Sequence, residues 1–219
     1  MSLAPPHRDR DADQILGEKL YYDSVGYLYR AVSWLDHFER TPRFTTLLYA
    51  CIEARMGIEY LLFEELVIST GARLSREDYE QCLKNRNSFS KLIRQLSPDH
   101  LKAQEFTRAV TEIWTAAPTL VYWDPRELEK AWGKLSKCLH WIGARTETTD
   151  DKDWLDRAGT SVRDVVVPIW DRISSGQSGL LHPSNMNPQV RQLWEDFRSG
   201  RIELNSVKIR LEILQPAHA

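Results

Sequence analysis

The feature that most constrains the fold is the apolar run from Thr41 to Ser69, the longest in the chain. Wound into a helix, the run carries apolar side chains on every side, and such a helix is buried all round. Charged residues interrupt it before it reaches the roughly 20 apolar residues that a membrane-spanning helix needs: Glu53, Arg55, Glu59, Glu64 and Glu65. The run therefore predicts the fully buried central helix of an all-α bundle.

Arg55 and Glu59 lie four residues apart within this run, a spacing that places two side chains on one face of a helix. A buried charge without a partner destabilises a protein by several kcal/mol, so we expect the two to pair with each other or with a third group. Either they form a structural ion pair, or they belong to a polar pocket, because buried charges with shifted pKa values often mark sites. Both residues are therefore candidates for a binding pocket.

Apolar residues at helical spacing predict further helices on both sides of the central run. The expected helices cover about residues 13–39, 75–84, 88–96, 98–117, 124–142, 150–173 and 187–199. The short connection at 40–42 predicts that the first helix and the central helix are antiparallel neighbours. Asn187 followed by Pro188 is typical of a helix start.

The pattern changes after Gly200, where apolar and polar residues alternate through Ile202, Leu204, Val207, Ile209, Leu211 and Ile213. This alternation predicts a small β-hairpin over 201–214. Two strands alone are marginal in water, so we expect either the bundle or a second copy of the chain to cover the hairpin. A homodimer is expected on this ground. The predicted organisation is a disordered tail over 1–12, a helical bundle over 13–175, and an appendage of one helix and the hairpin over 186–219.

Composition indicates the environment and excludes some partners. The formal net charge of −2 gives no general excess of positive charge for a polyanion, which disfavours nucleic acid as a partner without excluding it. Cys51, Cys82 and Cys138 lie in helical patterns without CxxC or zinc spacing, which predicts reduced thiols in a cytoplasmic protein. The polar N-terminal stretch lacks the apolar core of a signal peptide. We expect an unknown protein or small ligand as partner, and no membrane association.

The chain also lacks the motifs of several common chemistries. It has neither GxxxxGK[ST] nor GxGxxG for phosphate binding, no HExxH, no Glu-x-x-His pair for a di-iron site, and no GxSxG elbow. We therefore expect no metal and no cofactor.

Two histidines are further candidates for a binding pocket. His140 falls near the end of the helix expected at 124–142, where the helix dipole favours a histidine for structural reasons alone. His182 falls in the turn-rich segment 174–187, and loops of that length are either functional or merely mobile.

Several segments together resemble the HEPN superfamily of helical bundles over residues 13–175. They are the central segment from Cys51 to Glu59, the pair Arg86-Asn87, and the segment from Leu135 to His140. Members of that superfamily often carry an Arg followed by a polar residue, with a His four to six residues after the Arg, and cleave RNA without a metal. In this chain no His follows Arg86-Asn87 within that range.

The resemblance implies a helical bundle and leaves two functions open. The first is a non-catalytic protein that binds a ligand or another protein. The alternative is a metal-independent ribonuclease that uses Arg94 and His100, which have the required spacing. The two hypotheses differ in one spatial requirement, because general acid–base catalysis needs the two side chains to converge in one cleft.

Overall fold

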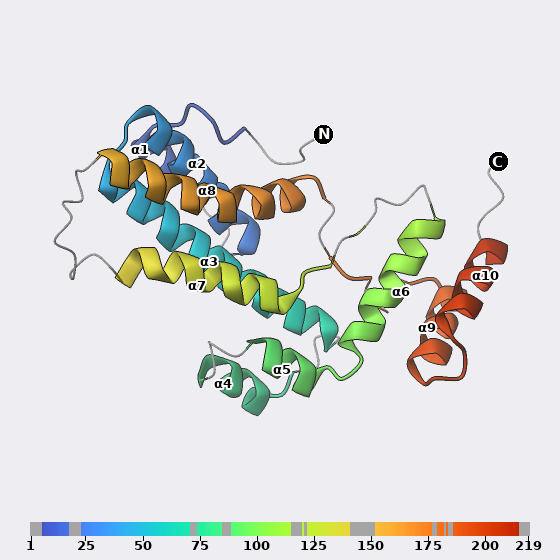
Figure 1. Ribbon diagram of the computed structural model, residues 1–219. Coiled ribbons are helices and arrows are strands. Elements are labelled where there is room, and N and C mark those ends of the chain that lie inside the picture. Colours follow the sequence, from blue (N-terminus) through green and yellow to red (C-terminus); the bar gives the residue numbers. More distant parts are fainter. Residues whose placement is uncertain are drawn as a thin grey trace. The chain divides into compact units, whose positions relative to one another are not determined.

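The computed structural model describes residues 6–17, 23–70, 74–84, 89–114, 120, 122–140, 152–176, 179–181, 183 and 186–214. Within these ranges the chain forms ten helices and no strand, so the predicted all-α class is confirmed (Figure 1). No helix of the described part is long and apolar enough to cross a membrane. The chain divides into two compact units, each built from two separate stretches of sequence. The domain boundaries expected from the sequence stay a prediction.

The first unit comprises residues 1–62 and 125–175. It contains α1 (Ala12–Leu16), α2 (Ser24–Arg40), the first part of α3 (Phe44–Ser69), α7 (Pro125–His140) and α8 (Lys152–Ser174). α2 packs against α1 and α8, and α7 packs against α8. The segment before α1 contacts α2, where the Tyr29 hydroxyl donates to the Pro6 carbonyl (2.9 Å) and Arg10 donates to the Ser33 hydroxyl (3.0 Å).

Three contacts define how α2 and α3 pack. The Tyr27 and Tyr60 rings lie 5.1 Å apart, Arg30 lies 2.8 Å from Glu53, and the Trp34 and Tyr49 rings lie 5.2 Å apart. Residue numbers rise along α2 as they fall along α3, so the helices are antiparallel, as the short connection predicts.

Gly57 permits the close approach of these two helices. A Cβ atom at this position would lie only 2.6 Å from Leu28 Cγ and 3.2 Å from the Leu28 backbone nitrogen. The side chain that glycine lacks would therefore push α2 and α3 apart.

α3 is not buried on all sides, so that expectation is wrong. Thr45, Tyr49 and Ile52, at intervals of four and three residues, form one exposed stripe; Tyr49 retains 43% of its accessible surface and Ile52 retains 41%. The first two carry hydroxyl groups that water can hydrogen-bond, whereas a helical wheel scored by apolar content counts Tyr49 as core.

The second unit comprises residues 63–124 and 176–219. It contains the end of α3, α4 (Arg76–Lys84), α5 (Phe89–Leu96), α6 (His100–Ile113), α9 (Pro188–Arg198) and α10 (Leu204–Leu214). Its main core lies among α6, α9 and α10, where the Phe106 ring packs 5.4 Å from Trp194 and 6.2 Å from Phe197. α9 begins as predicted, because the Asn187 side chain caps it by accepting from the Val190 N–H (2.8 Å).

The predicted β-hairpin over 201–214 is wrong, because α10 occupies that segment. Val207 and Leu211 are fully buried against α6 and α9, whereas Ile209 and Ile213 are exposed. Residues four apart share a face in a helix and in a strand alike, so the two buried positions suit both structures. The homodimer was expected because the hairpin needed a surface to cover it. Without the hairpin that reason no longer applies, and the homodimer stays a prediction.

Candidate functional site

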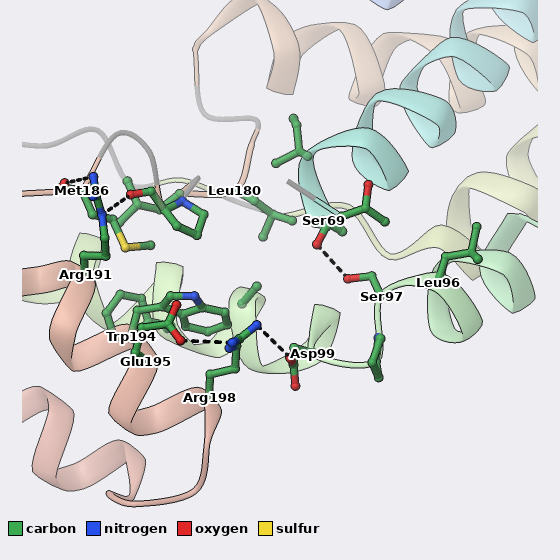
Figure 2. Close-up of a pocket in the computed structure, with 17 residues that line it drawn as sticks. Ser69, Leu96, Ser97, Asp99, Leu180, Met186, Arg191, Trp194, Glu195 and Arg198 are labelled. Carbon is green, nitrogen blue, oxygen red and sulfur yellow. Dashed lines mark hydrogen bonds and ion pairs between the residues drawn. The ribbon is translucent and has the colours of Figure 1, made fainter. Parts of the chain in front are cut away.

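The second unit contains a cavity of about 600 Å³, shown in Figure 2. The ends of α3 and α5, the first part of α6, one face of α9 from Arg191 to Arg198, and the segment before α9 contribute to its walls. Most of the lining side chains are apolar, among them Leu96, Phe106, Leu180, Met186 and Trp194. The walls can therefore bury the apolar body of a ligand.

Charged groups lie at two places in this cavity. Arg198 pairs with Glu195 (3.1 Å) and lies 3.7 Å from Asp99, so one guanidinium is shared by two carboxylates (Figure 2). Arg191 donates from Nε to the Pro183 carbonyl (3.0 Å) and from Nη2 to the Met186 carbonyl (3.2 Å). These contacts hold both guanidinium groups in place.

The segment before α9 is attached to the unit at the residues that the structure describes. Leu180 and Met186 are buried, and the Leu181 N–H donates to the Thr107 hydroxyl of α6 (3.0 Å). Part of the turn-rich segment predicted at 174–187 is thus a wall of the cavity.

Near the cavity, the buried His100 has hydrogen-bond partners at both ring nitrogens. Its Nδ1 lies 2.6 Å from the Ser69 hydroxyl, and its Nε2 lies 2.8 Å from Gln104 Nε2. The Gln104 amide also donates to the Trp123 carbonyl (3.2 Å), which identifies its NH₂ end. Nε2 must therefore accept, and Nδ1–H donates to Ser69.

This tautomer determines what His100 can do. Its Nδ1 already carries a proton and cannot take one from the Ser69 hydroxyl, so the two do not form an activated nucleophile. Burial lowers the pKa of His100, and the charge of Asp124 partly offsets that effect. A neutral, fully hydrogen-bonded imidazole is the expected state at neutral pH.

The two residues of the ribonuclease hypothesis occupy different surroundings. Arg94 is exposed on α5, whereas His100 is buried at the start of α6, and neither lines the cavity. The described geometry therefore does not favour the convergence in one cleft that acid–base catalysis by this pair requires.

Arg55 and Glu59 do not form the expected ion pair. Both are half-buried, and the ion pairs among the described residues do not include them. The Arg55 guanidinium lies instead over the Trp132 ring, 4.5 Å from its centroid. Delocalised charge over an aromatic face is favourable without a carboxylate. Their role in a binding pocket stays a prediction.

The remaining sequence candidates are only partly described. His140 ends α7, but its side chain lies outside the described residues, as does the whole of His182. Within the described residues, no group of three or more His, Cys, Asp or Glu side chains could hold a metal ion.

The residues that line the cavity were not identified from the sequence. Arg191 and Arg198 are two helical turns apart on α9, with Trp194 between them, and this spacing was an available signal. Asp99 gave no signal, because its role depends on the fold bringing α6 against α9. Comparisons of the chain with family models, with curated proteins and with solved structures found no match.

Proposed function

We propose that the protein is a non-catalytic helical binding protein of HEPN-like build, and that the cavity beside α6 and α9 holds a small organic ligand. The observation that carries the proposal is the cavity, whose volume of about 600 Å³ lies within the range of roughly 300–1,000 Å³ typical of small-molecule sites. Its apolar walls would exclude water from the ligand. Its few charged side chains would orient one polar end.

The polar groups at the cavity favour binding over catalysis. Arg198 already shares its charge with Asp99 and Glu195. The Ser69 hydroxyl accepts a hydrogen bond from His100, which leaves this serine without a base to activate it. Among the described lining residues, none is a nucleophile with a hydrogen-bonded base.

A fluorescent naphthalene sulfonate dye tests the proposal, because its emission rises when it leaves water. We expect the dye to bind the folded protein, and Ala103→Trp, which fills the cavity from α6, to abolish binding. Ala131→Trp is the matched control, because Ala131 is also half-buried but lies on α7, away from the cavity. Chemical denaturation of each variant verifies that it is folded. Equal dye binding by folded Ala103→Trp and the control would contradict the proposal.

A further inference from the structure

Two cysteines meet where α3 packs against α7 in the first unit. The side chains of Cys51 and Cys138 lie within hydrogen-bond reach of each other. Arg55 on α3 also contacts Trp132 on α7. Cys51 lies one turn before Arg55, and Cys138 lies after Trp132, as expected for two antiparallel helices. Antiparallel helices therefore place the two sulfurs opposite each other.

The two thiols differ in accessibility. Cys51 keeps 1% of its accessible surface, whereas Cys138 is half-buried and lines a cavity of about 340 Å³ between α7 and α8. A reagent from solvent therefore reaches Cys138 first. Lys134 and Lys137 line the same cavity and bring two positive charges to the approach to Cys138.

The contact with Cys138 favours the protonated form of the buried sulfur. It raises the pKa of Cys51, as do burial and the neighbouring charge of Cys138, so Cys51 stays a protonated thiol. Because solvent reaches Cys138 and not Cys51, Cys138 is the thiol that attacks first, and the buried Cys51 reacts second.

We propose that Cys51 and Cys138 form a thiol–disulfide exchange site, in which Cys138 reacts with an anionic low-molecular-weight disulfide and Cys51 resolves the adduct. The class of the disulfide follows from the cavity lining. Two lysines and the single carboxylate of Asp164 match a molecule that carries more carboxylates than amines, such as oxidised glutathione. This site is separate from the ligand cavity of the second unit and does not depend on it.

The reaction proceeds by two exchanges. The Cys138 thiolate attacks one sulfur of oxidised glutathione, the S–S bond breaks, and one glutathione thiolate leaves and is protonated. The adduct no longer carries the Cys138 charge, which eases the loss of the Cys51 proton to solvent. Cys51 then attacks the Cys138 sulfur and displaces the second glutathione thiolate. The two cysteines lose two electrons and two protons, and the disulfide becomes two thiols.

The test uses the full-length reduced chain incubated with oxidised glutathione, followed by intact-mass measurement and non-reducing peptide mapping. Wild type is expected to lose two hydrogens and to yield a peptide linked from Cys51 to Cys138. Cys51→Ala is expected to gain one glutathione at Cys138, because nothing resolves the adduct. Cys138→Ala is expected to form no such adduct or link. Cys82→Ser serves as the control and should behave as wild type.

A second arm tests the class of disulfide. Cystamine, a cationic disulfide, should react more slowly with Cys138 than oxidised glutathione does. Lys134→Gln combined with Lys137→Gln should remove that preference. A wild-type chain without the linked peptide, a Cys51→Ala chain without the Cys138 adduct, or an unchanged preference in the lysine variant would overturn the proposal. The wild-type peptide map needs no substitution, so the proposal can fail even if a variant does not fold.

Discussion

The guanidinium of Arg30 on α2 lies 2.8 Å from the carboxylate of Glu53 on α3, with the Arg30 side chain 4% exposed and that of Glu53 21% exposed. The contact is an ion pair without hydrogen-bond geometry, and Nε and Nη1 of Arg30 are buried without hydrogen-bond partners. The Tyr27 ring lies 4.7 Å from the guanidinium. Glu53 is therefore the main group that compensates the positive charge of Arg30, because the Tyr27 ring compensates it only weakly.

Removing this carboxylate should strand the buried charge. We expect Glu53→Ala to lower the free energy of unfolding by about 3 kcal/mol, as measured by chemical denaturation. Arg30→Met together with Glu53→Leu should recover much of that loss. Glu80→Ala is the control, because its partner Arg76 is 92% exposed, and it should change stability by less than about 1 kcal/mol. Additive losses for Arg30→Met and Glu53→Leu would show that the pair is not coupled.

Two glycine substitutions should have opposite effects on stability. Gly57→Ala should destabilise by about 1–3 kcal/mol, because its Cβ would overlap Leu28 on the neighbouring helix. Gly133→Ala lies in α7 with nothing within 4 Å of the new Cβ, so it should stabilise by about 0.5–1 kcal/mol. Thermal or denaturant unfolding of both variants measures the effect. A Gly57→Ala variant as stable as wild type or more so would mean that α2 and α3 are not in tight contact at Gly57.

Stability should fall as the pH drops below the ordinary histidine pKa of 6.5. Burial lowers the pKa of His100 in the folded protein, so below 6.5 the unfolded chain binds more protons than the folded one. The stability that His100 contributes is therefore present above 6.5 and is lost as the pH falls toward the folded pKa. Denaturant midpoints across this range measure the effect.

His100→Gln should flatten this pH dependence. Burial and Arg8 also lower the pKa of His7, which acts in the same direction, so His7→Gln is the comparison that separates the two contributions. An unchanged pH profile in His100→Gln would show that the imidazole does not titrate as expected.

Purified protein should not cleave mixed single-stranded RNA in EDTA. His100 uses both ring nitrogens in structural hydrogen bonds, and Arg94 is exposed on a different helix. His100→Ala should therefore lower stability without removing any catalytic activity. Cleavage by the wild type that disappears in a folded His100→Ala variant would instead support the ribonuclease hypothesis.

Local signals in the sequence predicted most of the helices, because each depends on residues close together in the chain. Asn187 and Pro188 marked the start of α9 through one cap and one fixed backbone angle. The prediction for α10 was a hairpin, because the spacing of Val207 and Leu211 suits both the helical and the strand period. Local propensity predicts secondary structure least well where packing against distant helices decides the structure of a segment.

The sites depended on contacts that no local pattern encodes. Arg55 and Glu59 had the spacing of a pair within one helix, but the buried pair joins Arg30 and Glu53 from two helices. The cavity lining likewise combines residues from Ile68 to Arg198. Hydrophobic periodicity shows which face of a helix is inward, and not which helix lies opposite.

The discontinuous second unit has a consequence for the order of events during synthesis. Phe106 on α6 packs against Trp194 and Phe197 on α9, and the stretch 125–175 between them belongs to the other unit. At roughly 5–20 residues per second, the ribosome adds α9 several seconds or more after α6. During that interval the apolar face of α6 lacks its native cover. The nascent chain is then a substrate for holding chaperones, and pausing within 125–175 should increase misfolding.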